Sequence, residues 1–349
     1  MDYRKWFKNC IILSIIILIL CGMLTVVVDP FFHFHKPYFK YRLLEPRYTN
    51  DGISRHFDFD GIIIGTSMSQ NFKTSEFDSY FGTNSVKLPY EGAGYKELSI
   101  SLRTALERNP DVKKVLWIVD YNGLLRDADW SQYDDYPTYM YDDNPFNDIP
   151  YLFNKFVLLH GTLPNIARTI LGQESMTMDE YSSWDVPTGA SVLYMGRRAK
   201  SFDGIREYTK EDEAEVIRTF EENFLSVIRD YKDVEFYLYF TPYSIYNWEA
   251  LMADGNVERT IDAQETATEL LLSCDNVKLY SFFEYTDIIC NLDYYRDEAH
   301  YDSRVSSMIL DFISRDEGLL TWDNYKDRIA WQKEFYENFD YDGYFAWME

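Results

Sequence analysis

The feature that most limits what this chain can fold into is a series of short apolar runs. Each run stops at a polar residue, at Gly or at Pro. Segments with helical spacing separate them, and in the region 96–107 Leu98, Leu102 and Leu106 share one face of a predicted helix. Strands that alternate with helices in this way predict a mainly parallel sheet with helices on both faces. The predicted strands cover 62–64, 85–88, 114–119, 234–240 and 277–282.

The second half of the chain continues the alternation. Thr209 to Asp212 resembles a helix capping box, and an apolar stripe from Val216 to Ile228 comes directly after it. Further helices are predicted over 261–272 and over a last stretch that carries Val305 and Ile313. We therefore expect an α/β domain and find no internal repeat.

The N-terminal region predicts a membrane anchor. No residue from Asn9 to Val28 is charged, and this span of 20 residues matches the length needed to cross a bilayer as a helix. The basic residues Arg4, Lys5 and Lys8 precede it, so the positive-inside rule puts the N-terminus in the cytoplasm and the remainder outside. A cleaved signal peptide is the alternative, but the run is long for one and lacks a small-x-small cleavage site.

These features give a predicted domain plan. Aromatic residues interleaved with Lys and His after the anchor suit a membrane interface, although His33 and His35 could also form a metal pair. The region 125–200 loses the regular pattern and is expected to be an insertion. The plan is a cytoplasmic N-terminus (1–8), an anchor (9–28), a juxtamembrane segment (29–57), a catalytic domain (58–319) and an acidic, aromatic tail (320–349).

Charge narrows the partners. The whole chain carries a net charge of −24, and its first eight residues carry +2, so the part beyond the anchor carries −26. A negative charge of this size disfavours binding to nucleic acid. The acidic stretch 133–143 lacks the spacing of a calcium loop, and Gly196-Arg197-Arg198 is a small basic island. Cys274 and Cys290 could pair or stay as buried thiols.

The turn after the first predicted strand presents a serine. Gly65-Thr66-Ser67 comes after Ile62-Ile63-Ile64, which is typical of a strand, a tight turn and a helix start. A serine at this place can act as a nucleophile with helix N-terminal amides beside it, although a hydroxyl there is also a common helix cap.

Other polar groups are expected at the same edge of the sheet. Gly92 and Asn122 come after the next two predicted strands, and active sites of open α/β sheets gather at the carboxyl ends of strands. With the amide of Ser67 they could bind an oxyanion. His300 lies three residues after Asp297, so on a helical turn the carboxylate could orient the imidazole toward Ser67.

These blocks resemble a known superfamily. Gly65-Thr66-Ser67, Gly92, Asp120-Tyr121-Asn122 and Asp297-Glu298-Ala299-His300 are similar in order and spacing to the four blocks of the SGNH (GDSL-type) hydrolases. The resemblance covers about residues 58–315. It is closest to the membrane-anchored, extracytoplasmic branch of Gram-positive bacteria, which includes the teichoic-acid D-alanylation protein and partners of membrane-bound O-acyltransferases.

The resemblance implies a fold and a set of roles. The fold would be a flavodoxin-like three-layer sandwich, with Ser67 as nucleophile, His300 as base and Asp297 as its partner. Gly92 and Asn122 would complete the oxyanion hole, with Gly94 as a rival to Gly92. Thr66 stands where the family often has Asp, and Asp120 stands where the third block has Gly.

Two functions are expected from these features. The first is a membrane-anchored esterase or O-acyltransferase that acts on acyl esters of a cell-envelope polysaccharide, without cofactor or metal. A membrane-bound O-acyltransferase is an implied partner. The second is a catalytically inactive subunit of such a system that binds glycan or serves as a scaffold.

Overall fold

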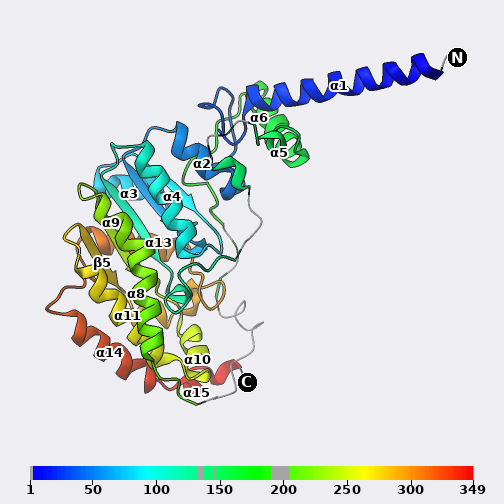
Figure 1. Cartoon of the computed structure of the whole chain (residues 1–349). Helices are drawn as coiled ribbons and strands as arrows, with labels where there is room; N and C mark the ends of the chain where they lie inside the picture. The colour runs from blue at the N-terminus through cyan, green and yellow to red at the C-terminus, as the bar shows by residue number, and fades with distance from the viewer. Residues whose placement is uncertain are drawn as a thin grey trace. The chain divides into compact units, whose positions relative to one another are not determined.

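The computed structural model describes residues 3–132, 137–142, 144, 146–184, 186, 188–189 and 204–348. The chain forms two compact units (Figure 1). Unit 1 comprises Met1–Asp58 and Asp134–Ser182, and unit 2 comprises Phe59–Tyr133 and Ser183–Glu349. The acidic stretch 133–143 belongs only in part to the described residues, and the basic island 196–198 lies outside them.

Unit 2 is built on a five-stranded sheet with the order β2-β1-β3-β4-β5, and all its pairings are parallel. This is the strand order of flavodoxin-like folds, so the predicted fold class is confirmed. The predicted strands match the observed ones to within one residue at each end. They are β1 (Gly61–Gly65), β2 (Ser85–Pro89), β3 (Lys114–Val119), β4 (Glu235–Phe240) and β5 (Val277–Ser281).

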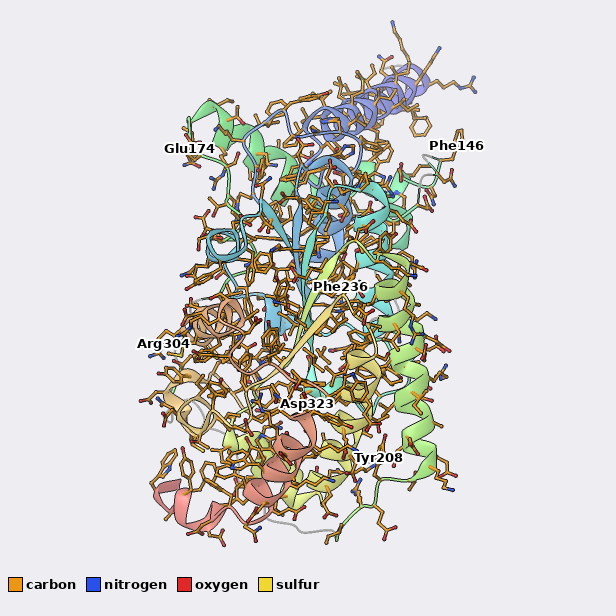
Figure 2. All side chains as sticks on the ribbon, turned by 90° about the vertical axis from the view of Figure 1, so that its left-hand side faces the viewer. Phe146, Glu174, Tyr208, Phe236, Arg304 and Asp323 are labelled. Atoms are coloured by element: carbon orange, nitrogen blue, oxygen red, sulfur yellow. The ribbon has the colours of Figure 1, made fainter. Side chains whose placement is uncertain are left out.

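The strands are buried because helices cover both faces of the sheet. Every residue of β1 and β2 is buried, and Phe236 of β4, labelled in Figure 2, is fully enclosed. Such continuous apolar strands are typical of parallel sheets. On one face α3 (Thr74–Phe81) packs against α13 (Ser303–Ser314). The other face carries α4 (Tyr95–Arg108), α8 (Lys210–Phe220), η5 (Glu221–Leu225), α9 (Ser226–Asp230) and α11 (Val257–Leu272).

The predicted C-terminal tail is folded into unit 2. Its helix α14 (Tyr325–Glu337) packs against α11. Tyr336 is fully buried, and its ring is stacked on that of Trp248 with the ring centroids 3.8 Å apart. The remaining elements of unit 2 are η1 (Ser67–Ser69), η2 (Tyr121–Gly123), α10 (Ile245–Ala253), α12 (Thr286–Ile289), η6 (Leu292–Tyr294), α15 (Tyr341–Tyr344) and η7 (Ala346–Met348).

Unit 1 begins with the long apolar helix α1 (Tyr3–Val28), which alone among the described helices is long and apolar enough to cross a membrane. Only its last turns are buried, at Gly22, Thr25 and Val28. The other elements of unit 1 are α2 (Pro46–His56), η3 (Thr138–Met140), α5 (Ile149–Leu152), the π-helical turn η4 (Val157–Thr162) and α6 (Leu163–Ile170).

Asp29 lies directly after the long helix and organises the loop that leaves it. Its buried carboxylate accepts hydrogen bonds from the backbone amides of His33, Phe34 and His35 and from the hydroxyl of Tyr151, at 2.7–3.0 Å. A separate apolar core forms around Phe31, Met140, Tyr151 and Val157. The aromatic residues predicted at a membrane interface are therefore partly internal, because Phe31 and Phe32 are buried in this core or beside it.

Candidate active site

The carboxyl end of β1 sets the position of Ser67. Gly65 ends the strand where a Cβ atom would lie 2.8 Å from Cβ of Ile118, so the tight packing of β1 on β3 requires glycine. Thr66 then caps η1, and Ser67 is the first residue of that short helix, half-buried at its N-terminus. The first amides of a helix lack intrahelical acceptors, so the N–H of Ser67 is available to a ligand.

Thr66 and Asp120, which follow the ends of β1 and β3, are hydrogen-bonded to each other. The hydroxyl of Thr66 donates to the carboxylate of Asp120 at 2.7 Å. The same carboxylate accepts hydrogen bonds from the backbone amide of Asn122 at 3.2 Å and from the hydroxyl of Tyr243. A carboxylate at the end of β3 thus ties together the loops that leave β1, β3 and β4.

A buried lysine fixes the loop on the other side of Ser67. Lys87 of β2 is fully enclosed, and its ammonium donates to the carbonyl oxygens of Gln70 at 2.5 Å and Phe72 at 3.0 Å. A buried cation needs such acceptors, because an unpaired charge in the interior is costly. Lys87 therefore holds the chain that leaves η1.

The structure brings His300 and Asp297 to Ser67. The Oγ atom of Ser67 lies 2.7 Å from Nε2 of His300, and Nδ1 of His300 lies 2.8 Å from Oδ2 of Asp297. The carboxylate of Asp297 also accepts hydrogen bonds from the backbone amides of Ala299 at 3.0 Å and His300 at 2.8 Å. These distances match those that a serine nucleophile, a histidine base and an orienting carboxylate would need.

The Asp297–His300 segment is a non-helical bend, which differs from the predicted helical turn. It lies between Tyr295 and Tyr301, which pair as an isolated antiparallel bridge, and α13 begins only at Ser303. The carbonyl oxygen of Glu298 accepts two hydrogen bonds from Ser244, from its hydroxyl at 2.7 Å and its amide at 3.1 Å. The bend is thereby attached to the loop after β4.

Two carboxylates bias the protonation of His300. Burial disfavours the charged imidazolium, but the hydrogen bond and charge of Asp297, together with the charge of Asp120, outweigh it and raise the pKa of His300. Burial acts to raise the pKa of Asp297, but its hydrogen bonds and the charge of His300 prevail and lower it. The pair is thus arranged to accept a proton at His300 while Asp297 stays ionised.

Gly92 and Asn122 lie on the strand ends that flank Ser67, because β1 runs between β2 and β3. Gly92 is half-buried with a φ of 66°, a conformation that favours glycine. Gly94 is buried, and a Cβ atom there would lie 1.9 Å from the carbonyl oxygen of Trp130. Packing therefore explains Gly94 and leaves Gly92 as the partly exposed glycine of the loop. Asn122 is exposed.

Trp184 flanks the site and was missed by the sequence reasoning. Its ring meets the His300 ring edge-on, with centroids 6.5 Å apart, and the guanidinium of Arg296 lies 5.5 Å from the centroid of the same indole. The side chain of Asn71 accepts a hydrogen bond from the backbone amide of Trp184 at 3.0 Å and so fixes it beside η1. Nothing in the local pattern of the insertion marked this residue.

The described residues contain no group of three or more His, Cys, Asp or Glu side chains that could hold a metal ion. His33 and His35, weighed as a metal pair, have separate partners in unit 1. Nε2 of His33 lies 3.0 Å from Oδ1 of Asp148, whereas the ring of His35 contacts the carbonyl oxygens of Val26 and Lys36. Cys274 and Cys290 are free thiols, and burial raises the pKa of Cys290 to about 11.

Comparisons with known proteins give only remote likenesses among solved structures. No family model and no curated protein matches the sequence. A solved structure from Streptococcus pneumonia, described as a candidate platelet activating factor, is similar with 14% sequence identity and a TM-score of 0.43. The match covers 78% of this chain and 89% of that chain. A likeness this distant does not establish an activity, and the chain is assigned to no family by these comparisons.

Proposed function

We propose that this protein is a membrane-anchored, extracytoplasmic serine esterase or O-acyltransferase that acts on acyl esters of a cell-envelope polysaccharide. The observation that carries the proposal is the hydrogen-bonded series from Ser67 through His300 to Asp297, with distances of 2.7 and 2.8 Å. The resemblance of the sequence blocks to those of SGNH hydrolases supports Ser67 as nucleophile, His300 as base and Asp297 as the partner of His300.

In the first half-reaction Ser67 Oγ attacks the carbonyl carbon of the acyl ester while Nε2 of His300 takes the hydroxyl proton. The tetrahedral oxyanion is stabilised by the amides of Ser67 and Gly92 and by the side-chain amide of Asn122. The intermediate then collapses: the bond to the alcohol breaks, and His300 returns the proton to the leaving oxygen. An acyl ester on Ser67 remains.

In the second half-reaction an acceptor hydroxyl gives its proton to His300 and attacks the acyl-serine. Water as the acceptor completes hydrolysis, and a glycan hydroxyl completes transfer, so both outcomes use the same residues. In both cases Ser67 recovers its proton from His300 as its ester bond breaks. Asp297 holds the imidazole tautomer throughout.

Charge and location favour a neutral polymer as the acceptor or donor. The part of the chain beyond the anchor carries a net charge of −26, which would repel a polyanionic teichoic acid. The apolar helix α1 suits a protein held near the envelope rather than one that digests soluble esters. A membrane-bound O-acyltransferase that supplies the acyl group is the partner implied by the resemblance.

The test uses the full chain in detergent or lipid and a fluorophosphonate probe, which reacts with activated serines. We expect one modified peptide, carrying the probe on Ser67, and no labelling of a His300→Ala variant. A folded wild-type protein that stays unlabelled while a control serine esterase reacts would favour the inactive, glycan-binding alternative. Analysis of O-acyl groups on envelope polysaccharides from a deletion strain would then identify the acyl group and the polymer.

A further inference from the structure

One segment of unit 1 differs in chemistry from the rest of this acidic chain. No Asp or Glu occurs from Ile149 to Gln173, and the segment carries only Lys155 and Arg168 as fixed charges. It forms α5, η4 and α6. Large apolar side chains are exposed along it: Ile149, Phe153, Leu159, Leu163, Ile170 and Leu171.

The exposure of these residues is too high for an ordinary soluble surface. Ile170 is 79% exposed, and its neighbour Leu171 is 70% exposed. Leu163 and Ile170 lie two turns apart and therefore share one face of α6. Just before the segment Phe146 is 87% exposed, and Figure 2 shows it projecting from the ribbon. Several large apolar side chains exposed within one stretch of chain indicate a surface that something apolar covers.

The anchor helix itself indicates what covers the segment. Helix α1 contacts both α5 and η4, and Figure 1 shows α5 and α6 beside its C-terminal part. A Cβ atom on Gly22 would lie 3.3 Å from the ring of Phe153, so the two residues are at the same level along α1. Gly22 precedes Val28, the last residue of the uncharged run, by six positions, which is about 9 Å of helix. That level lies inside the apolar layer if the run spans a bilayer.

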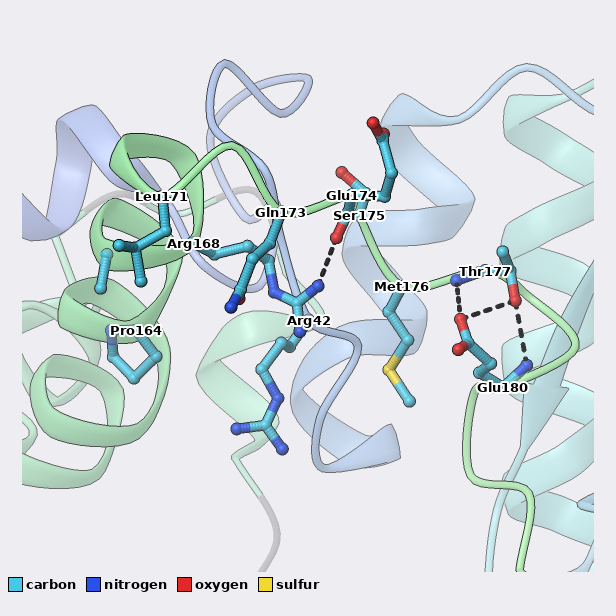
Figure 3. A pocket seen from close by; sticks show the side chains of 11 residues that line it. Arg42, Pro164, Arg168, Leu171, Gln173, Glu174, Ser175, Met176, Thr177 and Glu180 are labelled. Carbon is cyan, nitrogen blue, oxygen red and sulfur yellow. Dashed lines mark hydrogen bonds between the residues drawn. The ribbon is translucent and has the colours of Figure 1, made fainter.

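The adjoining pocket supplies charges that suit phospholipid headgroups. It has a volume of about 710 Å³, and its lining includes the apolar side chains of Leu171 and Met176, the guanidinium groups of Arg42 and Arg168, and the carboxylates of Glu174 and Glu180 (Figure 3). Both carboxylates have partners within unit 1: Glu174 pairs with Lys40, and Glu180 accepts hydrogen bonds from Thr177. The Arg42 guanidinium has no hydrogen bond or ion pair within the described part of the chain, and the Arg168 guanidinium donates to the carbonyl oxygen of Glu174. Guanidinium groups beside apolar side chains match an anionic phosphate next to acyl chains.

We infer that α5, η4 and α6 are seated in the outer leaflet beside α1, with Arg42 and Arg168 facing lipid phosphates. This surface goes beyond the single anchor and rests on the proposed membrane location, but it does not depend on catalysis at Ser67. We assign lipid rather than a protein as the covering material, because Phe153 of the segment lies at the level of Gly22 in the apolar run of α1 and the segment contains no Asp or Glu.

Photo-crosslinking of the full chain tests this surface. The crosslinking residue p-benzoyl-phenylalanine replaces Ile170 in one sample, Leu163 in a second and Asp58 in a control. Asp58 also belongs to unit 1, and its side chain is 90% exposed. The proteins are irradiated in cell membranes and in nanodiscs of phosphatidylcholine with phosphatidylglycerol. We expect a mass increase of one phospholipid at positions 170 and 163, and none at position 58.

The competing outcomes are distinct. A crosslink from position 170 to one defined protein in cell membranes, without lipid adducts, would show that a membrane protein covers the segment. The inference would be overturned if no lipid adduct formed in nanodiscs although the protein resisted alkaline extraction from cell membranes. In that case the anchor would still hold the protein in the membrane. The double variant Arg42→Gln, Arg168→Gln should lower the share of phosphatidylglycerol among the lipid adducts. Excess inorganic phosphate should leave that share unchanged, because the inferred ligand is a lipid phosphate and not free phosphate. Fluorophosphonate labelling of Ser67 in each sample reports separately on the proposed catalytic function.

Discussion

Each unit contains a histidine hydrogen-bonded to an aspartate, and the two pairs differ in surroundings. In unit 1 the side chains of His33 and Asp148 lie 3.0 Å apart and are 5% and 4% exposed. The other ring nitrogen of His33 is buried without a partner among the described residues. In unit 2 the side chains of His300 and Asp297 lie 2.8 Å apart and are 30% and 37% exposed.

The difference shows what a His–Asp pair needs before it can transfer protons to a substrate. The free nitrogen of His300 reaches a hydroxyl at 2.7 Å on a partly open surface. The second nitrogen of His33 reaches neither solvent nor a nucleophile within the described part of the chain. The His300–Asp297 pair therefore suits acid–base catalysis, whereas the His33–Asp148 pair stabilises the fold of unit 1.

Removal of the Ser67 hydroxyl, the proposed nucleophile, should have the largest effect. Ser67→Ala leaves the His300–Asp297 pair intact but abolishes covalent capture, so fluorophosphonate labelling and ester hydrolysis should fall to background. Ser69→Ala is the matched control, because Ser69 is buried and its hydroxyl donates to the carbonyl oxygens of Gly65 and Thr66. Labelling that persists in Ser67→Ala would show that another residue is the nucleophile.

Neutralising the Asp297 carboxylate, the proposed orienting group, should have the second-largest effect. Asp297→Asn keeps the size of the side chain but favours the wrong tautomer of His300, and we expect a loss of about 10³- to 10⁴-fold in the rate of hydrolysis. The melting temperature should change little, since the site is partly exposed. A rate within a few-fold of wild type would exclude Asp297 from the catalytic machinery.

The corresponding change in unit 1 should affect stability instead of rate. Asp148→Ala leaves His33 buried without its partner, which costs about 1–3 kcal/mol in the free energy of unfolding. Thermal unfolding in detergent would measure the loss. Asp58→Ala serves as the control, because it removes an exposed ion pair with Lys36 that contributes only about 0–1 kcal/mol. An equal effect of both substitutions would contradict the structural role of His33 and Asp148.

The smallest expected effect concerns pH. His300 acts as a base only when neutral, so its raised pKa puts the acid limb of the rate profile above the ordinary histidine value of about 6.5. Activity should rise as pH increases through that limb. Asp120→Asn removes one of the charges that raise the pKa, and the limb should move to lower pH. A limb that stays in place or moves upward would show that Asp120 does not act on His300.

Sequence patterns predicted the sheet and suggested the residues of the candidate site, because both depend on local features. A buried parallel strand leaves an apolar run, and the residues after it must lie at one edge, so Ser67, Gly92 and Asn122 could be grouped in advance. Asp297 and His300 were identified as a pair, although the bend that joins them is held by Ser244, far away in the chain.

Contacts between distant segments could not be predicted in this way. The hydrogen bond between Thr66 and Asp120 joins the loops that follow β1 and β3. Trp184 reaches His300 from an irregular segment without periodicity. The pairing of His33 with Asp148 spans 115 positions. The amphipathic character of α6 was present in the sequence, but its short length and the irregular stretches around it obscured the period.

The order in which unit 1 is made sets a constraint on the maturation of the protein. Asp29 and Phe31 leave the ribosome early, but Tyr151 and Val157, which complete their surroundings, are made only after the first three strands of unit 2. The buried carboxylate and the aromatic core must therefore remain open during synthesis. The residues that follow α1 would be the last part of the N-terminal half to become resistant to proteases.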